Sequence, residues 1–297
     1  MRIVVTGGSG AIGRYVVRDL LAHGHTPVNV DARPAREHDE RVRFVQCDLM
    51  DAQATAAAVR DCDAVAHLAA IPNPQNDPPE RVLTVNMVTC FNVLEAARCN
   101  GIPRIVYACS ESSSGFGIHN VELKPLYLPI DEAHPCWPHE TYSLSKRFGE
   151  EMVENYAIAY GIQGIALRYC WVWTERDTSA VRGIVAAGLA GKPLDKPWFG
   201  AYIAPHDVAQ AFRLAIEYQF PHEQAVPFEA FYLTAETTFL AEPSLDAFRR
   251  HFDPLPEIHD PDYFRANPYA PVLDTRKAKR LLGFRATKDW RTFDRWD

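Results

Sequence analysis

Features that would direct this chain to a membrane or to a nucleic acid are absent from its sequence. No apolar run approaches the length that spans a bilayer, and a strand pattern begins directly after Met1 and Arg2, without a signal peptide before it. The basic residues are scattered and the formal net charge is -7, so the chain has no electrostatic footprint for phosphates. We therefore expect no membrane and no nucleic-acid partner.

Disulfide and metal patterns are absent as well. The chain has 7 cysteines, an odd and dispersed set without a CxxC pair, and most of them lie in apolar surroundings. Its 11 histidines show no helix-spaced metal pattern, so we expect no metal site. Reduced, buried thiols are typical of cytosolic proteins, and the expected location is cytoplasmic.

The chain does have apolar content and a regular alternation of strand and helix patterns. Its 297 residues, 47% of them hydrophobic, are enough for one large α/β domain or for two lobes. Strands are expected at residues 3–5, 27–31, 42–47, 64–70, 105–109 and 165–169, and helices after Gly13 and at residues 54–59, 85–99, 142–160 and 207–218. This alternation predicts an α/β fold with a doubly wound parallel sheet.

The most informative segment is TGGSGAIG, at residues 6–13. It follows a strand pattern and precedes a helical one, which is the context of a dinucleotide-binding loop. Gly7 allows a tight turn, Gly10 lets the backbone approach a pyrophosphate, and Gly13 lets the helix pack closely on the sheet. A tight turn that binds nothing is the alternative, and the flanking strand and helix favour cofactor binding.

Asp31 stands at the end of the second strand pattern, where a carboxylate can accept hydrogen bonds from the adenosine ribose hydroxyls. A carboxylate there repels a 2'-phosphate, so it favours NAD over NADP. Arg33 and Arg36 follow closely and are able to attract that phosphate instead. NAD is the expected cofactor, and an ordinary turn acid is the alternative interpretation of Asp31.

The pattern becomes less regular from Trp171 onward. The helical residues 207–218 are expected to return to the main sheet, and the segment from Phe239 to the end reads as a small, mostly helical lobe. We therefore expect a Rossmann-type NAD-binding domain in residues 1–170, with 201–235 returning to it. Residues 171–200 and 236–297 are expected to form a C-terminal substrate lobe.

Tyr142 and Lys146 stand four residues apart in one predicted helix, which places both side chains on one face. A lysine ammonium beside a tyrosine favours the phenolate and lowers the tyrosine pKa from its ordinary value near ~10. Such a pair can take or return the proton of an alcohol while a hydride moves to or from a nicotinamide. A surface aromatic-lysine pair is the alternative interpretation.

A serine-rich segment, Ser110-Glu111-Ser112-Ser113-Ser114, follows the fifth strand pattern. Residues just beyond the carboxyl ends of parallel strands line the ligand crevice, so a hydroxyl here can hold the reacting oxygen beside Tyr142. We assign Ser112 to that role, although the segment offers four serines. A solvated turn is the alternative.

Taken together, these residues resemble the extended short-chain dehydrogenase/reductase superfamily, in particular its NAD-dependent epimerase/dehydratase branch. The resemblance covers nearly the whole chain. It rests on TGxxGxxG at 6–13, the acid at 31, Asp-Leu at 48–49, HxAA at 67–70, Asn86, a serine four residues before Phe116-Gly117, YxxxK at 142–146 and the closing segment 274–284.

The resemblance implies roles for individual residues. Catalytic roles fall on Ser112, Tyr142 and Lys146. Cofactor contacts fall on Gly7, Ser9, Gly10, Ala11, Ile12, Gly13, Asp31, Asp48, Leu49, Leu68, Ala69, Ala70, Asn86, Tyr142, Lys146 and Cys170. Substrate contacts fall on Ser112, Ser113, Tyr142, Trp171, Arg176 and Arg182.

The chain departs from the nucleotide-sugar members of that branch after the sixth strand pattern. Trp171 replaces the asparagine that contacts the diphosphate, and Arg176 and Arg182 are the remaining cationic candidates. Trp171 and Trp173 are as consistent with a lobe-interface core as with stacking on the substrate.

We therefore expect an NAD-dependent oxidoreductase that transfers a hydride at a secondary alcohol carbon of a sugar or sugar acid, a small-molecule substrate. A UDP-sugar type 4-epimerase or dehydratase is the alternative, and a non-catalytic NAD-sensing protein is the alternative of another class. The family's four-helix interface suggests a homodimer through residues 85–99 and 142–160, with Met87, Phe91, Phe148 and Met152 exposed for it. Core positions of a monomer are the other interpretation of those four side chains.

Overall fold

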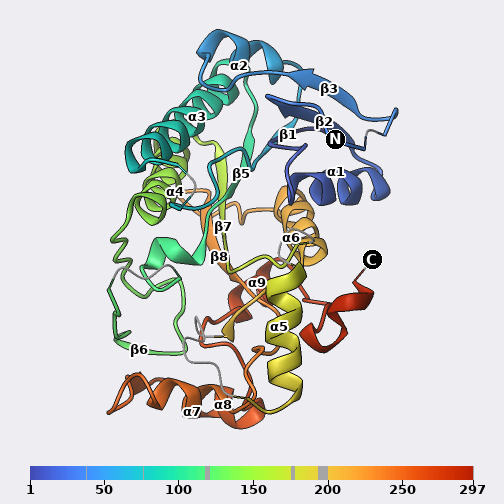
Figure 1. Ribbon diagram of the computed structural model, residues 1–297. Coiled ribbons are helices and arrows are strands. Elements are labelled where there is room, and N and C mark those ends of the chain that lie inside the picture. Colours follow the sequence, from blue (N-terminus) through green and yellow to red (C-terminus); the bar gives the residue numbers. More distant parts are fainter. Residues whose placement is uncertain (38, 76, 118–120, 175–177, 193–199, 297) are drawn as a thin grey trace.

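Seven strands form the central sheet of the computed structural model, which describes residues 1–37, 39–75, 77–117, 121–174, 178–192 and 200–296. The strands are β1 (Arg2–Thr6), β2 (Thr26–Asp31), β3 (Arg43–Gln46), β4 (Ala64–His67), β5 (Arg104–Ala108), β7 (Gln163–Tyr169) and β8 (Phe228–Leu233). All pair in parallel, in the order β3-β2-β1-β4-β5-β7-β8 (Figure 1). The predicted α/β fold with a doubly wound parallel sheet is confirmed.

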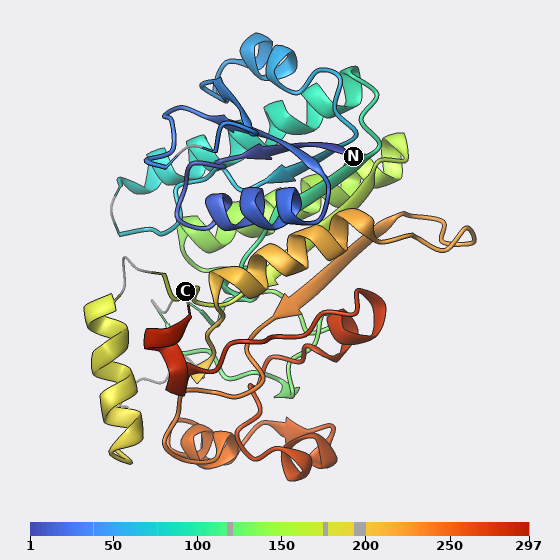
Figure 2. The same ribbon diagram turned by 90° about the vertical axis from the view of Figure 1, so that its right-hand side faces the viewer.

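The strands are apolar on both faces because helices cover both faces. In β1, Ile3 and Val5 pack into one core while Val4 packs into the other. Helices α1 (Gly13–Ala22) and α6 (Pro205–Glu217) cover the first face, which Figure 2 turns toward the viewer. Helices α2 (Ala52–Ala58), α3 (Pro79–Cys99) and α4 (Thr141–Tyr160) cover the second.

The strand order reverses direction at β1, which has β2 on one side and β4 on the other. In open α/β sheets, ligands bind outside the carboxyl ends of the strands at such a switch point. The glycine loop that follows β1 and the segment that follows β4 meet there. A Cβ added to Gly7 would lie 2.8 Å from the backbone nitrogen of Ala69.

A second group of elements lies beyond the carboxyl ends of the strands (Figure 1). It consists of α5 (Thr178–Leu189), α7 (Ser244–Arg249), α8 (Pro261–Ala266), the 3-10 helix η4 (Trp290–Arg295), and the parallel pair β6 (Tyr127–Leu128) and β9 (Glu257–Ile258). Trp173, Tyr202, Phe239, Trp290 and Trp296 form the centre of its aromatic core. Helix α9 (Arg276–Leu281) lies against β8 instead. No helix in the described ranges has the length and apolarity that crossing a bilayer requires.

Several elements differ from the sequence prediction, among them α3, α5 and β8. Helix α3 begins at Pro79 instead of residue 85, since a proline in the first turn has no amide hydrogen to lose and therefore starts a helix without cost. Helix α5 and strand β8 were not predicted. In α5 only Val181 is buried, and Gly188 contributes no side chain because the Trp290 ring fills the space beside it. The helix therefore lacks the one-sided apolar pattern by which a helix is predicted.

A buried ion pair fixes α4 on the sheet. Glu150 of α4 and Arg168 of β7 are 1% and 3% exposed, and they are joined by two hydrogen bonds of 2.5 and 2.8 Å. Arg147 adds a third contact to Glu150, at 2.6 Å. Burial alone would raise the pKa of Glu150, but the guanidinium of Arg168 outweighs it and the net shift is downward.

Replacing Glu150 by Gln is expected to lower the free energy of unfolding by about 3 kcal/mol, because it leaves the Arg168 charge buried without its partner. Folding lowers the pKa of Glu150 below its unfolded value of ~4.3. The contribution of Glu150 to the free energy of unfolding is therefore present above that unfolded pKa, and it is lost as the pH falls through the folded-state pKa. Chemical denaturation from pH 4 to pH 8 measures this. The variant should differ most from the wild type at neutral pH.

The matched control is Glu151→Gln, which removes a half-exposed partner of Arg147 on the same helix. An exposed pair contributes ~0–1 kcal/mol, so this variant should stay close to the wild type. Equal losses in the two variants would contradict the role of the buried pair.

Candidate active site

The glycine loop leaves the start of α1 open to an anion. Gly7 has a φ of +69°, and its amide donates to Val30 O at 2.9 Å, which makes the turn after β1 tight. A Cβ at Gly13 would lie 2.1 Å from Gly7 O, so the helix packs against the turn only with glycine there. Ile12 at the N-cap offers no side-chain oxygen to the first-turn amides, and no acid stands in that turn. These amides and the helix dipole suit the pyrophosphate of a dinucleotide.

The carboxylate of Asp31 lies beside this loop. It accepts hydrogen bonds from the amides of Ser9 (3.1 Å) and Arg33 (3.2 Å), which fix both oxygens. Its side chain is only partly buried, so it remains able to accept from a ribose. Arg33 and Arg36 are both exposed.

The segments after β3 and β4 complete the crevice around the loop. Thr6 Oγ1 accepts from the amides of Leu68 and Ala69 and contacts Nδ1 of His67 at 2.7 Å. Burial, with the charge of Lys146, lowers the pKa of His67 to about 3, so this histidine is neutral. Asp48, Leu49 and Ala70 lie in the same two segments.

Asn86 connects this crevice to α4. Its amide group bonds to both the N–H and the C=O of Ile71, at 2.7 and 3.1 Å, and donates to Ser145 Oγ at 3.0 Å. These bonds give Asn86 a positioning role. The predicted cofactor contact of Asn86 itself stays a prediction.

Tyr142 and Lys146 lie at the start of α4, against the carboxyl end of β5. They are 7% and 3% exposed. Lys146 Nζ donates to Ala108 O at 2.8 Å, and it lies 5.7 Å from the centre of the Tyr142 ring. Burial lowers the pKa of Lys146 to about 8, so the ammonium form still predominates at neutral pH.

The pKa of Tyr142 differs from the sequence expectation. The structure raises it well above its usual value, mainly through burial and then through the negative charges of Tyr169 and Glu111. Lys146 was expected to lower the pKa of Tyr142, but the net shift is upward because the cost of desolvating a phenolate at this buried position is larger. A hydrogen bond with Ser110 acts the other way and favours the phenolate.

Ser110, which the sequence did not single out, is the serine that acts on the pKa of Tyr142. It is the N-cap of the 3-10 helix η1 (Glu111–Ser114). Ser112 is fully buried and donates to Ser110 Oγ at 2.8 Å, and Ser113 is also fully buried. The segment offers four serines, and the sequence pattern does not separate Ser110 from the other three.

Glu111 is a second group that sequence reasoning missed. Its carboxylate accepts a hydrogen bond from Ser110 Oγ at 3.0 Å. Burial raises its pKa to about 7. The charge of this carboxyl group, which is bonded to Ser110, contributes to the raised pKa of Tyr142.

The residues predicted to contact the substrate are not all brought together. Trp171 is partly buried with its ring edge-on to Trp173 at 5.7 Å, while Trp173 itself is 1% exposed and belongs to the aromatic core. Arg182 forms an exposed ion pair with Asp294 at 2.8 Å, which links α5 to η4. Arg176 lies outside the described residues. Cys170 is buried directly after the carboxyl end of β7, and burial raises the pKa of its thiol well above the usual value.

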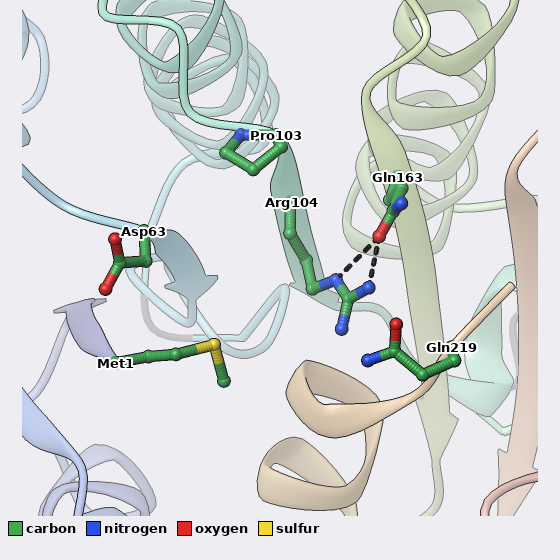
Figure 3. Close-up of a pocket in the computed structure, with 6 residues that line it drawn as sticks. All are labelled: Met1, Asp63, Pro103, Arg104, Gln163 and Gln219. Carbon is green, nitrogen blue, oxygen red and sulfur yellow. Dashed lines mark hydrogen bonds between the residues drawn. The ribbon is translucent and has the colours of Figure 1, made fainter.

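A separate hollow of about 510 Å³ lies at the amino ends of β4, β5 and β7, at the opposite ends of the strands from the glycine loop (Figure 3). Arg104 lines it, but its guanidinium bonds to the side-chain oxygen of Gln163 and to Ile216 O at the end of α6. A cation at a helix C-terminus is stabilised by the helix dipole. The hollow therefore belongs to the packing of α6 rather than to the crevice.

Comparison with known proteins agrees with this geometry. The sequence profile of the NAD dependent epimerase/dehydratase family matches residues 3–225. The chain is 33% identical over 191 residues to the putative UDP-glucose 4-epimerase of Methanocaldococcus jannaschii, across 62% of this chain and 60% of that protein. It is 30% identical over 241 residues to the uronate dehydrogenase of Agrobacterium fabrum, across 71% of this chain and 87% of that protein.

A solved structure has the same fold. The crystal structure of a UDP-galactose 4-epimerase superposes with a TM-score of 0.69 at 27% sequence identity, over 98% of this chain and 95% of that one. The alignment with the Methanocaldococcus protein spans less than two thirds of its length, whereas the alignment with the Agrobacterium protein spans most of it.

Asp31 is expected to give tighter binding of NADH than of NADPH. Asp31→Asn keeps an oxygen for the Ser9 amide but removes the charge that repels a 2'-phosphate. The ratio of NADH affinity to NADPH affinity should therefore fall about 10-fold, because one charged contact is worth ~1.5–3 kcal/mol. Fluorescence titration of both reduced cofactors measures this, with Asp39→Asn as the control. A wild-type preference for NADPH would show that Arg33 or Arg36 dominates.

Proposed function

This chain belongs to the NAD dependent epimerase/dehydratase family, and on that premise we propose that it oxidises a secondary alcohol of a simple sugar or sugar acid with NAD. One observation carries the proposal. Tyr142, Lys146 and the Ser110 hydroxyl lie together in a buried site at the carboxyl end of β5, beside the crevice of the glycine loop.

Each residue of this site has a separate task. Tyr142 takes the proton of the substrate hydroxyl, and Ser110 holds the reacting oxygen beside it. Lys146, anchored on Ala108 O, holds a positive charge near the phenol and lies where it can bind the nicotinamide ribose. NAD, when bound, would supply the hydride acceptor. Because burial raises the pKa of Tyr142, the phenolate forms only when positive charge gathers beside it.

Two observations favour a small, unactivated substrate over a nucleotide sugar. A diphosphate needs cationic or N–H partners, and Arg182 is already paired with Asp294. Trp171 stands where nucleotide-sugar members have an asparagine. The relative named uronate dehydrogenase, aligned over most of its length, supports the same class of substrate.

A UDP-sugar 4-epimerase is the second candidate, because the Methanocaldococcus relative is named as one. The two candidates are separated by calorimetry with UDP and UDP-glucose. We expect weak binding of both, and tight binding of either would place the epimerase first. A protein that senses NAD without turnover would not need the buried Tyr142, Lys146 and Ser110 set.

We also propose that the protein is a homodimer that acts in the cytoplasm. Helices α3 and α4 lie side by side on one flank of the sheet (Figure 1). Phe91 of α3 and Phe148 of α4 are 49% and 38% exposed there, and Met87 and Met152 are partly buried. The seven cysteines are free thiols, which a reducing compartment suits.

Tyr142→Phe should lower turnover by at least ~100-fold with little change in NADH affinity, because only the acid/base proton is lost. Ser110→Ala should lower turnover more than Ser112→Ala, since Ser110 acts on the pKa of Tyr142 and the Ser112 hydroxyl donates to Ser110. Steady-state kinetics of the three variants on one sugar, with NADH titration of each, measures this. A larger loss in Ser112→Ala would return that role to Ser112.

Light scattering at micromolar concentration should give the mass of two chains. Phe91→Asp should give the mass of one, because a charge cannot be buried in an apolar interface without a partner. Leu189→Asp is the control, since Leu189 is 64% exposed on α5, away from α3 and α4. A monomeric wild type would rule the dimer out.

A further inference from the structure

A buried histidine lies where three segments of the chain meet beside the site. His134 is 2% exposed, and its ring packs edge-on against Phe116 and Trp137, with 5.3 and 5.2 Å between ring centres. Phe116 follows the serine-rich segment after β5, and Trp137 lies on the segment that leads into α4 and Tyr142. The ring of Tyr127 in β6 is a third neighbour, at 5.0 Å. The histidine therefore contacts both segments that supply the site and one strand of the second group of elements.

The partners of the two ring nitrogens require one tautomer of His134. The backbone nitrogen of Leu126 lies 3.0 Å from Nε2, and an amide N–H can only donate, so Nε2 carries the lone pair. The carbonyl oxygen of Pro135 lies 2.8 Å from Nδ1, and a carbonyl oxygen can only accept, so Nδ1 carries the proton. Both partners are consistent with a neutral ring that has its proton on Nδ1.

The segment before α4 also holds the serine segment through the backbone. The amide of Trp137 donates to Ser114 O at 3.0 Å. A Cβ added to Gly115 would lie 2.3 Å from Trp137 O, so the two backbones approach each other closely there. The rings of Phe116 and Trp137 pack edge-on at 5.9 Å, and with His134 they form a closed cluster of three rings. A displaced histidine ring would therefore change the spacing between the serine segment and α4.

We propose that His134 is a positioning residue, whose neutral ring keeps the serine segment and the start of α4 at the separation that alcohol oxidation requires. The ring is buried and acts through Phe116 and Trp137. The inference rests on the proposed function for the reaction that is served. The tautomer of the ring and its contacts do not depend on that function.

The two hydrogen bonds explain why this position needs a neutral histidine. A phenylalanine ring would leave the amide of Leu126 and the carbonyl of Pro135 without these partners. A protonated histidine would carry a second N–H on Nε2, directed at the N–H of Leu126, and the bond next to β6 would be lost.

The surroundings of His134 favour the neutral form. Burial lowers its pKa, while the Pro135 carbonyl and the charge of Asp131 act the other way. Among the described residues, the ionisable groups that face the ring are Asp131 and Tyr127, and the Tyr127 hydroxyl donates to Asp131 at 2.7 Å. Because folding lowers the pKa of His134, its stabilising contribution is complete above the unfolded pKa of ~6.5. That contribution is lost as the pH falls from there through the folded-state pKa.

The kinetic test compares His134→Phe with His134→Gln at pH 7. His134→Phe should lower turnover about 10-fold or more with little change in KM for the sugar or in NADH affinity, because a misplaced reacting group can cost ~100-fold. His134→Gln should recover most of that loss, because the glutamine carbonyl can accept from the Leu126 amide in the place of Nε2. If His134→Phe does not fold, His134→Asn takes its place, since the shorter amide can reach Pro135 O but not the Leu126 amide.

The matched control is His259→Phe. His259 stacks on Tyr127 at 4.1 Å, on the side of the cluster toward β9, and its side chain is 47% exposed. This variant should keep the wild-type turnover. Equal losses in His134→Gln and His134→Phe, or wild-type turnover in His134→Phe, would overturn the positioning role.

A second readout needs no turnover. Long-range ¹H–¹⁵N NMR of the histidine rings, with His134→Gln identifying the signals, should show His134 with its proton on Nδ1 at pH 7. A ring protonated on Nε2 at that pH would overturn the proposal. A wild type that oxidises no sugar would instead overturn the proposed function, and the NMR spectrum would still decide whether His134 holds the Leu126 amide as a neutral acceptor.

Discussion

The close approach of α4 to the sheet is the constraint on which the site depends. Gly149 leaves the space that the Tyr107 ring of β5 fills, and a Cβ there would lie 2.2 Å from the hydroxyl of Tyr107. One residue along, Glu150 is bonded to Arg168 of β7, and one turn back, Lys146 is bonded to Ala108 O. These contacts fix the depth and rotation of α4, and with them the position of Tyr142 at the end of β5. Burial at that depth raises the pKa of Tyr142.

The parts of the site that could be predicted are contiguous in sequence. The glycine loop, Asp31 at the end of β2, and the four-residue spacing of Tyr142 and Lys146 all depend on local geometry, which a single strand, turn or helix determines. The chain order of strands and helices predicted the sheet for the same reason. Ser110 and Glu111 could not be chosen with confidence from the sequence, because the selection depends on how the short helix η1 turns its side chains toward α4. The direction of the Tyr142 pKa depends on total burial, a property of the folded protein alone.

The aromatic core beyond the carboxyl ends of the strands was not predicted, for a physical reason. It joins residues from widely separated segments, Trp173, Tyr202, Phe239, Trp290 and Trp296, and no local period marks such a cluster. Arg182 appeared free in the sequence, but it is paired with Asp294, 112 residues further along the chain.

The most direct measurement follows the absorbance of reduced nicotinamide when the wild-type protein is mixed with NAD and a panel of simple sugars and sugar acids. We expect NADH to accumulate well beyond one equivalent per chain with at least one of them, with one proton released to the buffer per NADH. A protein that forms no NADH with any member of the panel, and that interconverts UDP-glucose and UDP-galactose instead, would contradict this.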